Sequence, residues 1–167
     1  MPRHGSRALS LVLLLVACQG TASIAPEPKT GTYLIDNRII ALVDGSAEQP
    51  AAPGSASLAT TRLTDRQAVG DVNNDGKPDT AVVLTDSGGG SGTFYMLSVL
   101  LNDGGRGKAT NAFFLGDRVM VNSVNISGGV ITVDYLDRGA GQPFAAEPSA
   151  PIKKKFTVKD SQLSEQH

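Results

Sequence analysis

The side chains whose spacing best suits chemistry lie in one short run, Gly70-Asp71-Val72-Asn73-Asn74-Asp75-Gly76-Lys77-Pro78-Asp79. Asp71, Asn73 and Asp75 carry oxygen atoms at alternate positions, and the glycine after them allows the chain to bend tightly around one point. Hard cations such as Ca²⁺ bind about six to eight oxygen atoms, and the first, third and fifth positions of a loop can provide three of them. The run therefore predicts a calcium site.

Two further ligands follow in the same run. The backbone carbonyl of Lys77 would occupy the seventh position and the Asp79 carboxylate the ninth, with water completing the shell. The twelfth position falls on Val82 and not on a bidentate glutamate, so the loop is not an EF-hand. A metal-free alternative stays open, because Asp and Asn side chains also bond to nearby backbone N–H groups in Asx turns. If calcium binds, we expect its role to be structural.

The run resembles the strand–loop–strand calcium sites of FG-GAP-type repeats, in which Gly-Asp-x-Asn-x-Asp-Gly-x-x-Asp precedes an apolar strand. The chain has one copy and no self-similarity at a fixed period, so a propeller of such repeats is not expected. Residues 60–136 are also similar to an uncharacterised group of bacterial secreted and lipoprotein domains. The matching pieces are Gly70–Asp79, Gly89–Tyr95, Val99–Asn102 and Phe114–Val119.

The only cysteine, Cys18, follows a short apolar stretch near the amino terminus. Arg3, His4 and Arg7 make the first residues basic, and Ala8–Val16 is then apolar over a length well below the roughly 20 residues that span a bilayer. This pattern predicts a signal peptide over residues 1–17. A lone cysteine in an exported chain has no disulfide partner and needs another explanation.

Leu15-Val16-Ala17-Cys18 resembles the lipobox of bacterial lipoproteins. The resemblance implies cleavage before Cys18, diacylglycerol on its thiol and an acyl chain such as palmitate on the new amino terminus. It therefore implies a membrane partner, and Gln19 in place of aspartate implies the outer membrane. Residues 18–31 would form the lipidated cysteine and a flexible tether.

Charge and histidine content limit the function of the mature chain. Removal of residues 1–17 leaves 13 basic and 16 acidic residues, a formal charge of −3, which argues against nucleic acid as a partner. The two histidines are His4 and His167, so a Ser-His-Asp triad or a histidine-ligated zinc is not expected in the domain. We assign no catalytic residue. Carboxylate chemistry stays open through Asp86, Asp117, Asp134 and Asp137.

Glycine-rich turns and alternating apolar residues predict a mainly β fold, with one short helix allowed in 32–43. We expect a single antiparallel sheet or a small β-sandwich or meander over residues 32–160, followed by a disordered tail over 161–167. The expected strands are 32–43, 58–63, 67–69, 80–84, 93–101, 109–115, 118–126, 130–136 and 154–158, with a long loop over 46–57. Ser87–Gly92 is expected to be a flexible connection that could form part of a ligand-binding rim near the calcium loop.

These observations favour a membrane-anchored lipoprotein whose calcium-stabilised, β-rich domain binds a ligand or partner without catalysis. Two alternatives stay open at this point: an Asp-dependent hydrolase of an envelope polymer, and an accessory subunit of an envelope complex.

Overall fold

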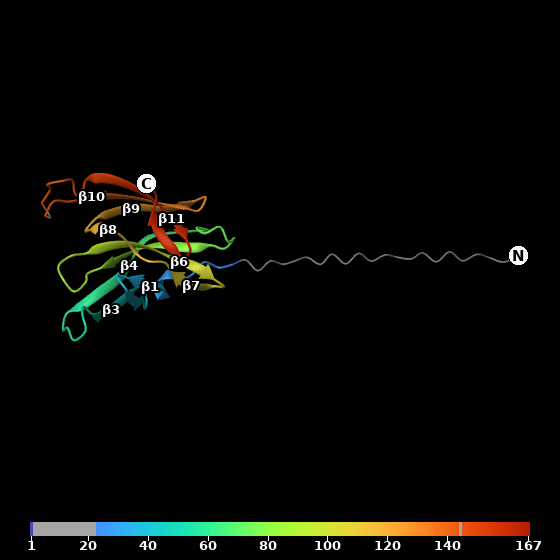
Figure 1. Ribbon diagram of the computed structural model, residues 1–167, viewed down its shortest axis with the longest axis horizontal. Helices are drawn as coiled ribbons and strands as arrows, with labels where there is room; N and C mark the ends of the chain where they lie inside the picture. Colours follow the sequence, from blue (N-terminus) through green and yellow to red (C-terminus); the bar gives the residue numbers. More distant parts are fainter. Residues whose placement is uncertain (2–22, 144) are drawn as a thin grey trace.

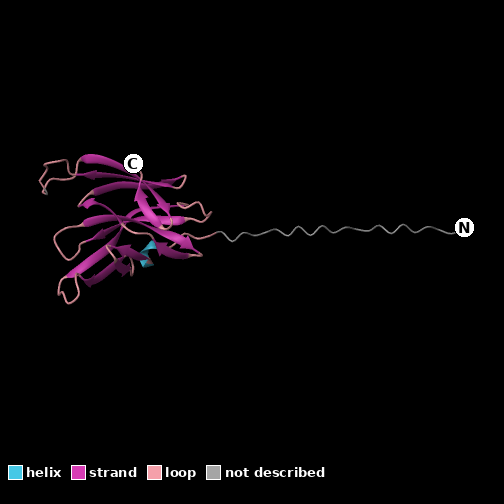
Figure 2. Cartoon of the chain, in the orientation of Figure 1, coloured by secondary structure: helices cyan, strands magenta, loops and turns pink. Residues whose placement is uncertain are grey.

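The computed structural model describes Met1, residues 23–143 and residues 145–167. Cys18 and almost all of the expected signal peptide lie outside these residues. In the described part the only helix is the 3₁₀ turn η1 (Pro28–Thr30), and strands make up nearly all other regular structure (Figure 2). The strands are β1 (Thr32–Ile35), β2 (Arg38–Ala41), β3 (Ser46–Pro50), β4 (Leu58–Gly70), β5 (Asp79–Asp86), β6 (Phe94–Asp103), β7 (Arg106–Ala109), β8 (Phe113–Asp117), β9 (Met120–Ser127), β10 (Val130–Asp137), β11 (Ala150–Lys159) and β12 (Gln162–Glu165).

The strands form three layers, which Figure 1 shows stacked. The central layer is a six-stranded sheet of order β3-β4-β5-β6-β7, in which β8 pairs with the other half of the same edge of β6. A four-stranded sheet of order β12-β11-β10-β9 covers one face, and the β1–β2 hairpin covers the other. The pairings between named strands are antiparallel, so the prediction of a mainly β, antiparallel fold is confirmed.

Strand β5 is the centre of the core because both of its faces are buried. Ala81 and Val83 pack toward the four-stranded sheet, with Ile131, Phe156 and other residues of that layer. Val82 and Leu84 point the other way and pack with residues of the hairpin such as Tyr33 and Ile40. Successive residues of a strand point to opposite faces, so an uninterrupted apolar run is what a strand between two layers requires.

The segment expected as one strand over 32–43, with a possible short helix, is a hairpin. Asp36 and Asn37 form its turn with φ of +47° and +62°. Two consecutive positive φ values match the twist of a tight hairpin, and Asp and Asn tolerate that conformation better than most residues. The hairpin buries Tyr33, Ile35 and Ile40, and the buried residues of β1 alternate with exposed ones as the period of a strand requires.

Strand β4 joins two segments that the sequence suggested were separate strands. Its pairing with β5 passes from Leu63 opposite Leu84 to Gln67 opposite Val82, so β4 carries two more residues than β5 across this step. Such a bulge bends a strand and redirects its side chains. Here it turns Arg66 toward the other sheet, where its Nε donates to the Val121 carbonyl at 2.9 Å.

Three further boundary predictions are wrong. Ser46–Pro50 was expected in a long loop but forms strand β3, which pairs with β4. Residues 161–167 were expected to be a disordered tail, yet Gln162–Glu165 form β12 and bury Leu163. The described part of the expected flexible tether, residues 23–31, contains η1 and is hydrogen-bonded to the central sheet. No helix among the described residues is long and apolar enough to cross a membrane.

Candidate functional site

The run that carries the predicted ligands connects β4 to β5; we call residues 71–79 the acidic loop. It lies at the end of the molecule where the amino-terminal segment and the β9–β10 turn are also found (Figure 1). Two glycines allow a close approach here, Gly70 between the end of β4 and β9, and Gly129 between the β9–β10 turn and the acidic loop. A Cβ on Gly70 would lie 2.7 Å from Ile126 Cγ2, and one on Gly129 would lie 3.2 Å from Asn74 Nδ2. The acidic loop is therefore held against both sheets.

Asp71, Asn73 and Asp75 direct their side-chain oxygens into the acidic loop. The two carboxylate oxygens of Asp71 accept hydrogen bonds from the N–H groups of Asp75, at 3.2 Å, and Gly76, at 2.8 Å. Asn73 Oδ1 accepts a second bond from the Asp75 N–H at 3.1 Å, and Asp75 Oδ1 accepts from the Lys77 N–H at 2.9 Å. The bonds that Asn73 and Asp75 accept from the N–H group two residues further on are those of Asx turns, whereas Asp71 accepts from N–H groups four and five residues further on.

The same bonds are compatible with calcium, because a carboxylate oxygen that accepts one hydrogen bond keeps a lone pair for a cation. The side-chain oxygens of Asp71, Asn73 and Asp75 are hard donors of the kind that calcium prefers. Within the described residues, however, no three acidic, histidine or cysteine side chains are grouped as a metal cage. Lys77 Nζ lies 4.0 Å from Asp75 Oδ2, so a bound cation would compete with this ammonium group. The donors fit calcium chemically but form only part of a coordination shell.

Asp79, the predicted ninth-position ligand, is buried and bonded to the backbone. Its Oδ2 accepts from the Val72 N–H at 2.9 Å and its Oδ1 accepts from the Asn102 N–H at 2.8 Å. Burial raises the pKa of Asp79, the two N–H groups act in the opposite direction, and the charges of Asp75 and Asp71 raise it further. Asp79 therefore ties the acidic loop to β6, a role that its position in the motif did not predict.

Asn102 is the residue that the sequence-based reasoning missed. It directly follows the expected strand 93–101 and was assigned no role, but it is buried at the end of β6 and its Nδ2 donates to Ser23 Oγ, to the Ile24 carbonyl and to the Pro78 carbonyl. Thr80 Oγ1 donates to the Pro26 carbonyl at 2.9 Å, beside this group. The segment 23–26 is thus fastened next to the carboxyl end of the acidic loop. Its partners are more than fifty residues away, so no local motif could have revealed the contact.

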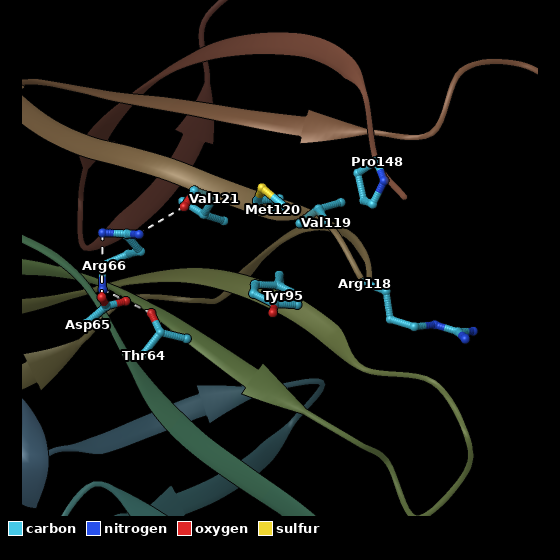
Figure 3. A pocket seen from close by; sticks show the side chains of 9 residues that line it. All are labelled: Thr64, Asp65, Arg66, Tyr95, Arg118, Val119, Met120, Val121 and Pro148. Carbon is cyan, nitrogen blue, oxygen red and sulfur yellow. Dashed lines mark hydrogen bonds and ion pairs between the residues drawn. The ribbon is translucent and has the colours of Figure 1, made fainter. Parts of the chain in front are cut away.

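A cleft of about 330 Å³ lies where the two sheets separate (Figure 3). Its lining residues are Thr64, Asp65, Arg66, Tyr95, Arg118, Val119, Met120, Val121 and Pro148. The β4 bulge forms one wall, and the segment from Arg118 to Val121 forms the other. Each arginine of the cleft is paired with a carboxylate. Arg66 Nη1 lies 3.5 Å from Asp65 Oδ2, and Arg118 donates two hydrogen bonds to the Asp117 carboxylate. The cleft offers a mixed polar and apolar surface with its charges paired.

The four carboxylates considered for hydrolysis are all engaged in structural contacts. Asp86 is buried against Arg38, Asp134 is bonded to Lys153 and Ser123, and Asp137 accepts from the Arg138 N–H. Asp117 accepts hydrogen bonds from Arg118, which lower its pKa. A general acid needs a raised pKa in order to keep its proton at neutral pH. Asp117 therefore lacks the electrostatic environment of a proton donor.

Ser87–Gly92 does not contribute to a rim around the acidic loop. It connects β5 to β6, so it lies at the opposite end of β5 from Asp79. In Figure 1 this connection and the β3–β4 and β10–β11 connections lie at the end away from the amino-terminal segment. We call this the far end of the domain. The prediction of a shared rim is wrong because an eight-residue strand separates the two loops.

Comparison with known proteins gives no further information on the function of the chain. No protein-family model matches the chain, and neither the curated proteins nor the solved structures contain a match.

Proposed function

We propose that the chain is a bacterial lipoprotein, anchored through Cys18, whose β-rich domain is a non-enzymatic binding or structural module stabilised by calcium. The anchor rests on the lipobox-like Leu15-Val16-Ala17-Cys18 and the preceding signal-peptide pattern. Two acyl chains or more suffice for stable membrane attachment, since each buried methylene contributes about 0.8 kcal/mol. The favoured location is the outer membrane, as Gln19 suggests.

The observation that carries the proposal is the attachment of residues 23–26 beside the acidic loop. Asn102 Nδ2 donates to the Ile24 carbonyl at 2.7 Å, and the N–H of the same residue donates to Asp79. A lipid on Cys18 would therefore reach the domain at the end that carries the acidic loop. The far end would then point away from the membrane, where a ligand or an envelope partner can reach it.

Calcium would act in this arrangement as a structural clamp. Asp71, Asn73, Asp75 and the Lys77 carbonyl would hold the ion, and Asp79, already bonded to the backbone, would contribute as the ninth-position residue or through water. The ion would offset the repulsion between the carboxylates of the loop. The charges of Asp75 and Asp71 contribute to the raised pKa of Asp79, which supports this proposal.

The anchor is tested by metabolic labelling with a fatty-acid analogue, followed by fractionation of the membranes. The wild-type chain should incorporate the label and sediment with outer membranes, whereas Cys18→Ser should incorporate none and lose its attachment. Gln19→Asp is the matched control, because it keeps the lipid and should change only the membrane in which the protein is found. If Cys18→Ser still carries label or stays fully membrane-bound, the lipid anchor is wrong.

A further inference from the structure

A second, smaller pocket opens at the far end of the domain. Its volume is about 250 Å³, and its lining residues are Asp36, Asp86, Phe94, Met96 and Phe114. They come from the β1–β2 turn, the end of β5, the start of β6 and the middle of β8. Elements that are distant in the sequence thus bring two aromatic rings and two carboxylates together.

Phe94 and Phe114 form two walls of this pocket and stay open to solvent. Their ring centroids lie 6.0 Å apart at an interplanar angle of 64°, and the side chains are 36% and 53% exposed. Large exposed aromatic side chains in a concave site are unusual unless they contact a partner. The two rings pack edge to face against each other, and the ring surface that stays exposed can attract an organic cation through its negative face.

The pocket carries a net negative charge, as the binding of a cation requires. The Asp86 carboxylate is compensated internally, since its Oδ2 lies 2.6 Å from Arg38 Nη2 and its Oδ1 accepts from Thr61 Oγ1 at 2.7 Å. Asp36 is exposed and makes no hydrogen bond or ion pair with another described residue. The pocket therefore keeps one uncompensated negative charge beside its aromatic walls.

The neighbouring ring in the chain shows what an occupied site of this kind looks like. Phe113 points to the opposite side of β8 from Phe114, and the ammonium group of Lys154 lies 5.4 Å from its ring centroid. The same ammonium is 2.7 Å from Glu165 Oε2. Phe114 and Asp36 offer the same combination of ring and carboxylate, but they are presented to solvent.

The glycine-rich connection between β5 and β6 helps to position one wall. A Cβ on Gly92 would lie 2.7 Å from Cζ of Phe94, so glycine lets the ring lie against the backbone of the loop. Gly88 is also adjacent, with a Cβ position 3.7 Å from the same ring. This close approach assigns Ser87–Gly92 a role that its sequence alone did not reveal.

We propose that the pocket formed by Asp36, Phe94 and Phe114 binds an organic ammonium group. The ring faces would contact the polarised methyl or methylene groups next to nitrogen, and the Asp36 carboxylate would provide the counter-charge. Both a primary amine, as in a lysine-type side chain, and a quaternary amine, as in a choline-type headgroup, have this chemistry. The proposal is independent of calcium and of the lipid anchor.

The test uses the purified full chain in a neutral maltoside detergent and follows the backbone amide signals of the pocket by NMR. Tetramethylammonium and n-butylammonium are the two probes, and tert-butanol and n-butanol are their neutral counterparts. We expect saturable shifts at Phe94 and Phe114 with the cations and no saturation with the alcohols over the same concentrations. Tighter binding of n-butylammonium would indicate a lysine-type ligand, and tighter binding of tetramethylammonium a headgroup-type ligand.

Three variants make the result specific. Asp36→Asn keeps a residue that tolerates positive φ and should weaken cation binding about two- to fivefold, as loss of one exposed ion pair predicts. Asp44→Asn, at another exposed turn position with φ of +50°, is its matched control and should bind like wild type. Phe114→Leu should weaken binding about three- to fivefold through the lost ring face. Equal binding of cations and alcohols, or equal affinities of Asp36→Asn and Asp44→Asn, would overturn the proposal.

Discussion

The buried carboxylate of Asp79 accepts a hydrogen bond of 2.8 Å from the backbone N–H of Asn102, twenty-three residues further along the chain. Its other oxygen accepts from the Val72 N–H, so one side chain connects the start of the acidic loop, the start of β5 and the end of β6. Asn102 in turn holds residues 23 and 24. The attachment of the amino-terminal segment and the shape of the acidic loop therefore depend on the same pair of residues.

Replacing Asp79 with asparagine should destabilise the domain by about 1–3 kcal/mol. The carboxylate accepts from two backbone N–H groups through two different oxygens, and an amide would turn its own NH₂ group toward one of them. Urea unfolding followed by circular dichroism measures this change. Asp103→Asn, at an exposed position on the same end of β6, is the control and should change stability by less than about 0.5 kcal/mol. Equal stability of the two variants would contradict the assignment of Asp79 as a structural tie.

Gly70→Ala should destabilise the packing between the end of β4 and β9 by about 1–3 kcal/mol, because the new methyl group would lie 2.7 Å from Ile126 Cγ2. Ile126→Ala removes the atom that it meets, so the double variant should be more stable than the sum of the single changes predicts. A double-mutant cycle from denaturant unfolding measures that coupling. Purely additive effects would show that the two residues are not in contact.

Asp117 should contribute to the acid sensitivity of the domain. Hydrogen bonds from Arg118 lower its pKa below the usual 3.8 in the folded state. A depressed folded pKa contributes stability that is present above the unfolded value and is lost as the pH falls through the folded value. The melting temperature of Asp117→Asn should therefore lie below that of wild type at pH 5–7, and the two should converge in stronger acid. A difference between them that stays constant from pH 7 to pH 2 would rule out this linkage.

The strongly apolar strands could be predicted from the sequence, whereas the weakly apolar ones could not. β5 and β10 carry the apolar runs and alternations of buried strands, and the structure has both near the expected positions. β3 consists of Ser-Ala-Glu-Gln-Pro and forms because it pairs with β4. β12 contains one buried residue, Leu163, and is held through pairing with β11 and through the side-chain amide of Asn111. Pairing with a neighbouring strand, and not local preference, determines these two strands.

In the candidate sites, too, residues close together in the sequence could be predicted, whereas contacts between residues far apart in the sequence could not. The oxygen side chains of Asp71, Asn73 and Asp75 were recognisable because their spacing is local, and the structure directs all three into the loop. The contact of Asp79 with Asn102, and the pocket between Asp36 and Phe114, join residues whose separation in the chain carries no periodic signal. Only the order of the strands brings these residues together.

The measurement that tests the central claim most directly is calcium binding by the purified chain, by titration calorimetry and by thermal melting with calcium or with a chelator. At free calcium about a hundredfold above the dissociation constant, linkage predicts about 2.7 kcal/mol of added stability. Asp75→Asn can keep the bond to the Lys77 N–H and should melt like wild type in chelator while binding calcium more weakly. No heat and no shift of the melting temperature at millimolar calcium, in wild type and Asp75→Asn alike, would show that the acidic loop is a metal-free Asx turn.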